Sequence, residues 1–255
     1  MKAESYCNRK TGLPEHNVIG WYATEKYDGQ RAQWSQSDGC LYSRYGNQVN
    51  APEWFLAPLQ DVSYRLDGEL FLGYGNWNLT ALFRSREDPE RQRTWHKVTY
   101  IVFDIADTEL GDYDERYSRL TVLFKTLKCR HIQLVTRTKI LSKTQLDEYY
   151  KSVLAKGGEG IMLNNPYSFY KDGRTDALLK HKPVVDEQCI VVGYKMGSGR
   201  NEGRLGSFIV HPIEDGEPQP KREFGLAGLT DDIRGNYKYT HPVGTVINNR
   251  CSEIT

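Results

Sequence analysis

Short strand-like runs dominate this chain, and they constrain its fold more than any other feature of the sequence. Three of these runs are rich in β-branched and aromatic residues, namely "HKVTYIVFDI" (96–105), "QCIVVGY" (188–194) and "SFIVH" (207–211). Two helices are well signalled. Residues 115–128 place apolar residues at helical spacing, and residues 143–156 open with Ser142 and Gln145 in a capping-box arrangement and close on Gly157-Gly158. Many strands with few helices predict an α+β fold built from antiparallel sheets.

A domain boundary is expected at Pro183. The chain of 255 residues is long enough for two domains. Proline interrupts strand pairing, and a fresh strand pattern begins directly after it. We therefore predict one domain over residues 1–183 and a second over residues 184–255. The second is rich in strand patterns and glycine, which suits a small β-barrel.

Composition excludes several classes of protein. Hydrophobic residues make up 38% of the chain and charged residues 26%, which favours a packed core over disorder. No apolar run approaches the roughly 20 residues that a membrane helix needs. The start "MKAESYCNRK" has no apolar secretory stretch. The five scattered cysteines form no Cys-x-x-Cys pair, which argues against a zinc site or a disulfide framework. We expect an intracellular protein, or a periplasmic one if a signal peptide has been removed.

The net charge of +1 does not by itself indicate a nucleic-acid binder. Any positive field must therefore come from a local arrangement. Two basic segments are candidates, "RSREDPERQRTWHK" (84–97) and "KMGSGRNEGR" (195–204). Each is interpreted either as a contact to a DNA backbone or as an ordinary solvated loop. In the second segment the candidate DNA contacts are Lys195, Arg200 and Arg204.

The stretch "TEKYDGQR" (24–31) collects two cations and a carboxylate around a glycine. A solvated turn is one interpretation, and a reactive Lys26 is the other. A free lysine has a pKa of about 10.4, so only about one in 2,500 is neutral at pH 7. Burial and neighbouring cations favour the neutral amine. Lys180 and Lys182 alternate in "LLKHKP" (178–183), so on a strand they would share one face and could supply those cations.

Two glutamates sit in apolar surroundings. Glu69 follows an expected Asp-Gly turn in "RLDGELF" (65–71), and Glu159 lies between glycines in "KGGEGIML" (156–163). Acidic side chains flanked by core residues are usually paired or bind metal. Together with Asp28 they would suit Mg²⁺, which takes few protein oxygens and completes its shell with water and phosphate. Structural ion pairs are the alternative.

Six blocks together resemble the covalent nucleotidyltransferases, which comprise DNA ligases, RNA ligases and mRNA-capping enzymes. The blocks, in order, are "EKYDGQR" (25–31), "SRYG" (43–46), "DGEL" (67–70), "VFDI" (102–105), "EGIM" (159–162) and "LKHK" (179–182). Arg31 and the "EGIM" block favour an ATP-dependent DNA ligase. The short length resembles the minimal ligases of bacteria and viruses. This resemblance implies an ATP-grasp-like nucleotidyltransferase domain of antiparallel sheets with flanking helices, followed by a small OB-fold barrel that is either complete or incomplete.

The resemblance also implies a role for each matching residue. Lys26 would attack the α-phosphate of ATP and form a lysyl-adenylate, while Asp28 would orient the site and its hydrated metal. Arg31 and Arg44 would contact phosphate, including the 5′-phosphate of a nick. For the nucleotide, the backbone near Glu25 would read the adenine edge and Phe103 would stack on adenine. Lys180 and Lys182 would bind the α-phosphate. Glu69 would hold the ribose or a metal, and Glu159 would bind the catalytic metal. Phe103 could instead be a core residue.

This resemblance favours a DNA ligase that uses ATP and Mg²⁺ as cofactors and has nicked double-stranded DNA as its partner. It would act as a monomer. An RNA ligase or a capping enzyme on the same scaffold is an alternative. A third is a nick-binding protein defective in self-adenylation, because Arg250 does not match the basic segment that orients pyrophosphate in such ligases.

Overall fold

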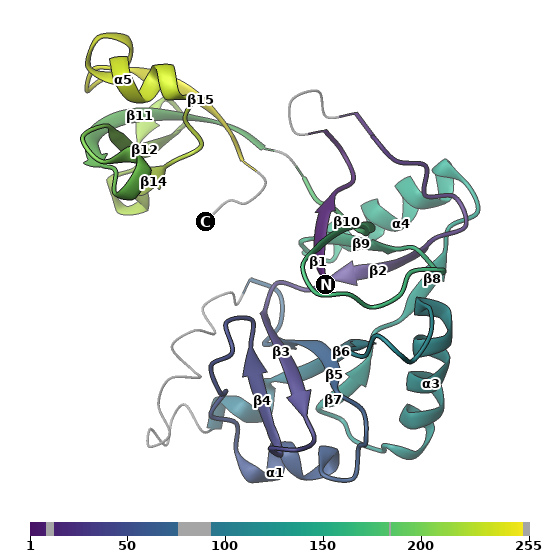
Figure 1. Ribbon diagram of the computed structural model, residues 1–255. Helices are drawn as coiled ribbons and strands as arrows, with labels where there is room; N and C mark the ends of the chain where they lie inside the picture. Colours follow the sequence, from purple (N-terminus) through teal and green to yellow (C-terminus); the bar gives the residue numbers. More distant parts are fainter. Residues whose placement is uncertain (9–12, 76–92, 184, 252–255) are drawn as a thin grey trace. The chain divides into compact units, whose positions relative to one another are not determined.

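The structure is a computed structural model that describes residues 1–8, 13–75, 93–183 and 185–251 (Figure 1). The chain divides into two compact units, Met1–Lys182 and Pro183–Thr255. Of the basic segment 84–97, residues 84–92 lie outside the described part, so its DNA-contact interpretation is not tested. None of the helices among the described residues is long and apolar enough to cross a membrane.

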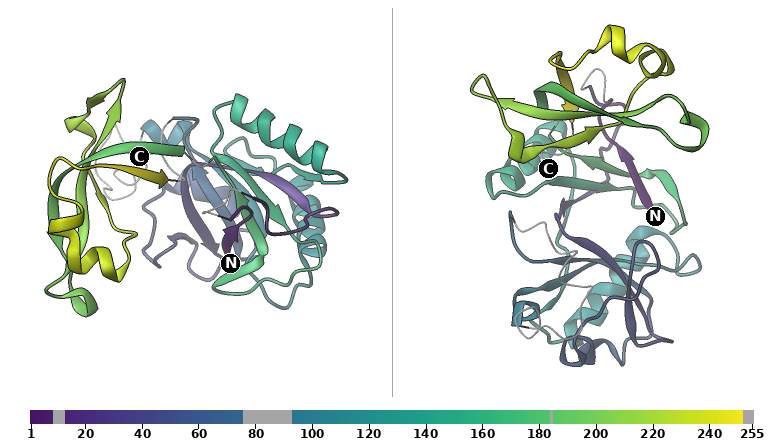
Figure 2. Two further views of the ribbon diagram at one scale, coloured as in Figure 1. Left: turned by 90° about the horizontal axis from the view of Figure 1, so that it is seen from above. Right: turned by 90° about the vertical axis from the view of Figure 1, so that its left-hand side faces the viewer.

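The first unit contains two five-stranded sheets. In strand order, the first sheet consists of β1 (Lys2–Ser5), β10 (Arg174–His181), β9 (Gly160–Asn164), β2 (Tyr22–Lys26) and β8 (Arg137–Lys139). Its pairs are antiparallel except β1 with β10. The helix α4 (Lys143–Ala155) packs on β9 and lies along one face of this sheet, as Figures 1 and 2 show. Apolar residues of that face and of α4 form one core, which includes Ala23, Leu146, Val153, Ile161 and Leu179.

In strand order, the second sheet consists of β4 (Cys40–Ser43), β3 (Gln30–Ser35), β5 (Leu66–Phe71), β6 (Thr99–Ile105) and β7 (Ile132–Leu134). All neighbours are antiparallel except β6 with β7. The helix α3 (Tyr113–Thr126) packs against β6 and β7, and the short helix α1 (Glu53–Leu56) adds Phe55 to the same core. That core also buries Trp34, Trp95 and Leu120.

Local signals explain where the two predicted helices begin. The Ser142 hydroxyl accepts a hydrogen bond from the Gln145 amide (3.1 Å), which caps the first turn of α4. The other predicted helix begins two residues earlier than expected, at Tyr113. The reason is a capping box in which Asp112 and Glu115 each accept from the other's backbone amide.

The second unit is an open sheet with one helix. β13 (Glu217–Pro218), β12 (Leu205–Glu214), β11 (Val185–Met196) and β15 (Val246–Cys251) lie in that order, and β14 (Phe224–Leu226) also pairs with β12. The described strands do not close into a barrel. The sequence analysis missed α5 (Asp231–Thr240), although Thr230 caps it and Asp231 and Asp232 occupy its first turn. The observed α+β architecture with mainly antiparallel sheets confirms the predicted fold class.

His181 lies at the end of β10 and packs against Tyr6 and Tyr150 beside the core that α4 covers. Its ring stacks on Tyr150 with 3.9 Å between ring centroids, and burial lowers the pKa of His181 to about 4. Because the unfolded chain binds the proton near pH 6.5 and the folded one near pH 4, stability is lost as the pH falls through this window. We expect the free energy of unfolding to drop by at most about 2 kcal/mol between pH 7.5 and pH 5.

Urea unfolding at several pH values checks this expectation. A His181→Phe variant should lose most of the acid sensitivity, whereas His16→Gln, which changes a histidine outside this cluster, should keep it. Equal acid sensitivity in the wild type and in His181→Phe would contradict the assignment.

Candidate active site

A cavity of about 650 Å³ lies in the first unit, and strands of both sheets line it. One wall is the face of the first sheet opposite α4. The pairing register sets Thr24 opposite Met162, and Met162 opposite Lys180, so these three side chains stand in a row across β2, β9 and β10. All three line the cavity. The other wall comes from the second sheet and includes Arg31, Glu69 and Phe103.

Lys26 is the last residue of β2 and lines this cavity. Its Nζ forms an ion pair with Oε2 of Glu159, while Oε1 of Glu159 accepts from Nζ of Lys182 at 3.1 Å. The side chains are 24% exposed for Lys26, 15% for Glu159 and 4% for Lys182. The carboxylate of Glu159 is thus held between two ammonium groups. The direct neighbour of Lys26 is therefore an acid, where the sequence analysis expected cations.

The two lysines of the "LKHK" block take different positions. Lys180 stands on β10 and lines the cavity, whereas Lys182 follows the end of that strand and is buried against Glu159. We expected both lysines to share one face of a strand. This is wrong for Lys182, because β10 ends at His181.

Glu69 stands on β5 directly opposite Arg31 of β3. Burial, followed by the charges of Asp67 and Glu159, raises the pKa of Glu69 to about 8, although Lys26 and Arg31 act in the other direction. Loss of solvation is the main cause, so the buried Glu69 carboxyl favours its neutral form.

Asp67 completes a tight pair with Arg31. Nε of Arg31 donates to Oδ1 of Asp67 at 2.8 Å, and Nη2 donates to Oδ2. Both residues line the cavity. The expected Asp67-Gly68 turn is wrong, because both residues lie within β5. A Cβ at Gly68 would stand 2.5 Å from a ring carbon of Tyr100, so the glycine serves close packing.

The other predicted nucleotide-site residues are spread around the cavity. Glu25, Arg44 and Phe103 line it, with Arg44 exposed just beyond the end of β4. The side chain of Glu25 accepts from the Tyr74 hydroxyl at 2.8 Å. Asp28 is exposed and does not contribute to the lining.

The predicted DNA contacts Lys195, Arg200 and Arg204 belong to the second unit and are all exposed. They lie in and beside the connection between β11 and β12, which contains a short 3₁₀ turn over Gly199–Asn201. Arg204 forms a loose ion pair with Asp231 at 3.9 Å.

The described residues fit a magnesium ion that arrives with phosphate. Among them, no group of three or more histidine, cysteine or acidic side chains forms a metal site by itself. Mg²⁺ usually takes one or two carboxylates and fills its shell with water and phosphate oxygens. Glu69 and Glu159 offer such carboxylates, because Glu69 lines the cavity and Glu159 contacts the Lys26 amine beside it.

A family model described as "ATP dependent DNA ligase domain" matches residues 1–182, the whole of the first unit. The chain belongs to the ATP-dependent DNA ligase family. This confirms the resemblance drawn from the six sequence blocks.

Curated relatives agree with this family. The chain is 28% identical over 240 residues to a DNA ligase of Haemophilus influenzae, covering 93% of this chain and 82% of that protein. It is 31% identical over 230 residues to DNA ligase 2 of Haloquadratum walsbyi, covering 81% of this chain but only 36% of the larger relative.

Solved structures of ligases resemble the whole chain. A structure from a study of DNA binding by Lig E DNA ligases, described as a minimal scaffold, has a TM-score of 0.80 and 27% identity, and the match covers 100% of this chain and 94% of that one. The Chlorella virus DNA ligase-adenylate shares the fold, with a TM-score of 0.52 and 20% identity over 96% of this chain and 88% of that one.

Gly29 of the "EKYDGQR" block allows the connection before β3 to approach β5 closely in this ligase-family site. A Cβ at position 29 would stand 2.2 Å from the Leu70 carbonyl oxygen and 3.0 Å from Cγ of Glu69. We expect Gly29→Ala to destabilise the protein by about 1–3 kcal/mol, because backbone cannot yield as a flexible side chain can. Displacement of Glu69 and Lys26 should also slow transfer of AMP by on the order of 100-fold.

Urea unfolding and labelling with α-labelled ATP measure the two effects of Gly29→Ala. Gly228→Ala is the matched control, since a Cβ there meets nothing within 4 Å. If Gly29→Ala behaved like Gly228→Ala in both assays, the close approach to Leu70 would have no importance for the site.

Proposed function

We propose that this chain is an ATP-dependent DNA ligase that seals nicks bearing a 5′-phosphate and a 3′-hydroxyl in duplex DNA. The observation that carries the proposal is the position of Lys26: its amine lies on the cavity, in contact with Glu159 and within electrostatic reach of Glu69. Membership of the ligase family and the likeness to DNA ligases over most of the chain support the same reading.

Lys26 is the nucleophile of this proposal. An ammonium nitrogen has no lone pair, so the amine must first give up a proton to solvent, and Glu159 holds the amine in place through Oε2. Nζ then bonds to the α-phosphorus of ATP as the bond to pyrophosphate breaks. Covalent capture of AMP on the protein divides one difficult exchange into easier steps.

Two further displacements complete the reaction. An oxygen of the nick 5′-phosphate attacks the phosphorus of the lysyl-adenylate, and the Lys26 amine leaves and regains a proton. The 3′-hydroxyl then attacks the activated 5′-phosphate, the phosphodiester bond forms, and AMP leaves. Each displacement depends mostly on positioning and on charge stabilisation.

The neighbouring side chains take supporting roles. Lys180 and Lys182 offset negative charge on the α-phosphate. Lys182 also donates a hydrogen bond to Glu159. Arg31 and Arg44 contact phosphate, and Asp28 orients the site. Phe103 stacks on the base, and the backbone at Glu25 reads its edge. Glu69 and Glu159 would hold Mg²⁺, which supplies charge neutralisation on the phosphate oxygens when it is bound.

The division of labour follows the two units. We assign adenylation to residues 1–183 and an OB-type DNA-binding role to residues 184–255. Lys195, Arg200 and Arg204 would follow a DNA backbone. The described cysteine side chains are free thiols, which suits a reducing, intracellular compartment. We further assign the active form to a monomer.

Gel-based nick sealing, run in parallel on plain and pre-adenylated nicks, tests the proposal. The wild type should seal both substrates in the presence of ATP and Mg²⁺. If it binds nicked DNA but seals neither substrate, the chain is a non-catalytic nick binder and the proposal fails. Preference for GTP, or for RNA nicks over DNA nicks, would indicate the capping or RNA ligase alternatives.

A further inference from the structure

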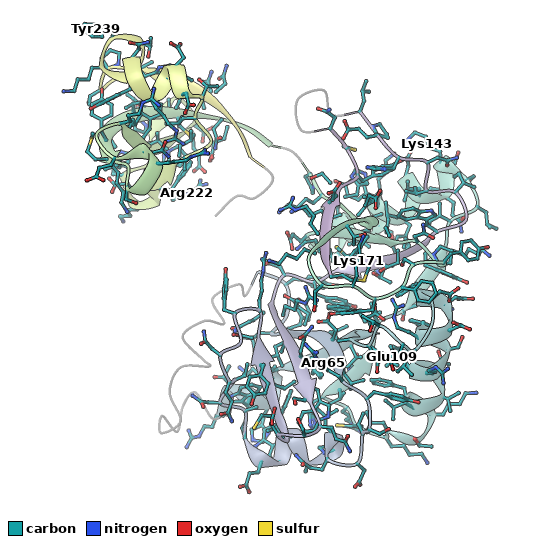
Figure 3. All side chains as sticks on the ribbon, in the orientation of Figure 1. Arg65, Glu109, Lys143, Lys171, Arg222 and Tyr239 are labelled. Carbon is teal, nitrogen blue, oxygen red and sulfur yellow. The ribbon has the colours of Figure 1, made fainter. Side chains whose placement is uncertain are left out.

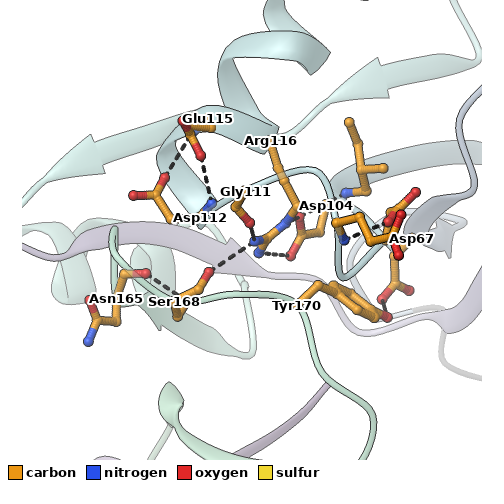
Figure 4. Close-up of polar contacts among 12 residues, drawn as sticks. Asp67, Asp104, Gly111, Asp112, Glu115, Arg116, Asn165, Ser168 and Tyr170 are labelled. Carbon is orange, nitrogen blue, oxygen red and sulfur yellow. Dashed lines mark hydrogen bonds and ion pairs between the residues drawn. The ribbon is translucent and has the colours of Figure 1, made fainter.

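A buried polar network joins the loop after β9 to the second sheet of the first unit (Figure 4). Arg116 of α3 is fully buried and donates to both oxygens of Asp104 at 2.7 and 3.0 Å. It also donates to the carbonyl oxygens of Gly111 (2.8 Å) and Ser168 (2.9 Å). The backbone of the 165–170 loop is thereby fixed against β6 and α3.

Tyr170 reaches from this fixed loop into the wall of the cavity. Its side chain is 4% exposed, and its hydroxyl donates to Oδ2 of Asp67 at 2.7 Å. The Tyr170 hydroxyl oxygen accepts from Nη2 of Arg31 at 3.3 Å and from Nε2 of Gln33 at 3.0 Å. Gln33 is in turn held by Arg65, whose Nη2 donates to Oε1 of Gln33 at 2.9 Å.

These contacts use most of the donors of Arg31. Nε and one hydrogen of Nη2 go to Asp67, the second hydrogen of Nη2 goes to Tyr170, and one hydrogen of Nη1 goes to the Met1 carbonyl oxygen. Since a guanidinium carries five N–H groups, one on Nη1 is left for a ligand in this arrangement. The direction of that last donor is fixed by the ring of contacts among Arg31, Asp67 and Tyr170.

Tyr170 was not singled out in the sequence, and no step of the proposed reaction uses it. We propose that Tyr170 is a positioning residue, which holds the guanidinium of Arg31, through Asp67 and by direct contact, in the orientation that meets the phosphate of the nick. The inference rests on the proposed function. Loss of the hydroxyl would leave a hydrogen on Nη2 without an acceptor and would remove one of the donors to Asp67, so the guanidinium could turn.

Burial, reinforced by the charge and hydrogen bond of Asp67, raises the pKa of Tyr170 well above its ordinary value. The hydroxyl therefore stays protonated and remains a donor throughout the pH range of an enzyme assay. Its effect on Arg31 should not vary with pH there.

Single-turnover sealing of a pre-adenylated nick tests this inference, because it isolates the last step from self-adenylation. We expect Tyr170→Phe to slow that step about 10-fold and Arg31→Lys to slow it more. The double variant should be no slower than Arg31→Lys alone, because Tyr170 acts through Arg31. A merely structural role would instead multiply the two losses.

Tyr100→Phe is the matched control. Tyr100 is fully buried in the same sheet, and its hydroxyl donates to the carbonyl oxygens of Ala32 and Leu66, so the substitution removes comparable hydrogen bonds without touching Asp67. Its sealing rate should stay within about 2-fold of the wild type, even if the melting temperature falls. Should Tyr170→Phe fail to fold, Gln33→Met removes a donor to the same hydroxyl, and about a 3-fold loss is expected.

The outcomes separate this inference from the proposed function. If the wild type seals no nick, the proposed function fails. If the wild type seals nicks, three results would overturn the positioning role. Tyr170→Phe could seal at the wild-type rate, or Arg31→Lys could show no loss of rate. The rate losses of Tyr170→Phe and Arg31→Lys could also multiply in the double variant.

Discussion

Replacing Lys26 by alanine is expected to abolish covalent labelling by α-labelled ATP and to slow sealing of a plain nick by on the order of 10⁴-fold or more. The variant lacks the atom that bonds to phosphorus, and the described neighbours of Lys26 offer no equivalent. Lys182 is buried against Glu159, and Lys180 stands on another strand. Gel autoradiography of the labelled protein measures the first effect, and nick sealing measures the second.

A matched control for Lys26→Ala is Lys143→Ala, which removes an exposed lysine at the start of α4 whose partner is Asp147 (Figure 3). That variant should label and seal like the wild type. Wild-type labelling of Lys26→Ala would move the nucleophile to another residue and would contradict the account.

Arg116→Met is expected to lower the free energy of unfolding by about 3–5 kcal/mol. The substitution leaves the carboxylate of Asp104 buried without its partner and leaves the carbonyl oxygens of Gly111 and Ser168 without their donor. Burial raises the pKa of Asp104, and Arg116 opposes this shift. Without the arginine, the folded protein should keep a proton on Asp104 to higher pH, so the variant should lose stability as the pH rises.

Urea unfolding at pH 5 and pH 8 measures both effects of Arg116→Met. The loss of stability should be greater at pH 8. Combining it with Asp104→Leu should restore part of the stability, since an apolar pair can replace a buried ion pair. A loss below about 1 kcal/mol at both pH values would mean that the pair does not stabilise the first unit.

Local signals in the sequence were sufficient for the parts of the fold that depend on neighbouring residues. The capping-box arrangement at Ser142 and the glycines after the helix, Gly157-Gly158, predicted α4 to within one residue at its end. The strand-like run at 96–105 contains β6, although its first residues, His96 and Lys97, belong to a 3₁₀ turn (Trp95–Lys97). α5 was missed because glycine and strand patterns in the second domain outweighed the cap at Thr230.

The candidate site depended on pairing across strands, and only part of this could be predicted. Lys26, Glu69 and Lys180 line one cavity, and Glu159 contacts Lys26 of that lining. Which side chain touches which is decided by register and by packing at strand ends. Register and packing place Glu159 between Lys26 and Lys182, which the sequence did not predict. They also place Asp67 within β5, where a turn was expected.

Tyr170 illustrates what sequence patterns leave out. It is separated from Arg31 by 139 residues and from Asp67 by 103, and nothing in the loop sequence "YSFYKDG" (167–173) marks one tyrosine as buried and the others as exposed. Tyr167 and Phe169 nearby are 78% and 62% exposed. Burial of Tyr170 follows from the anchoring of Ser168 by Arg116, which is a tertiary contact.

The chemical identity of the nucleophile is tested most directly by locating AMP on the protein. The wild type would be incubated with ATP and Mg²⁺, digested, and the adenylated peptide sequenced by mass spectrometry. We predict that AMP is found on the side-chain nitrogen of Lys26. AMP on any other residue, or a protein that seals plain nicks with ATP while its Lys26 peptide never carries AMP, would contradict the account.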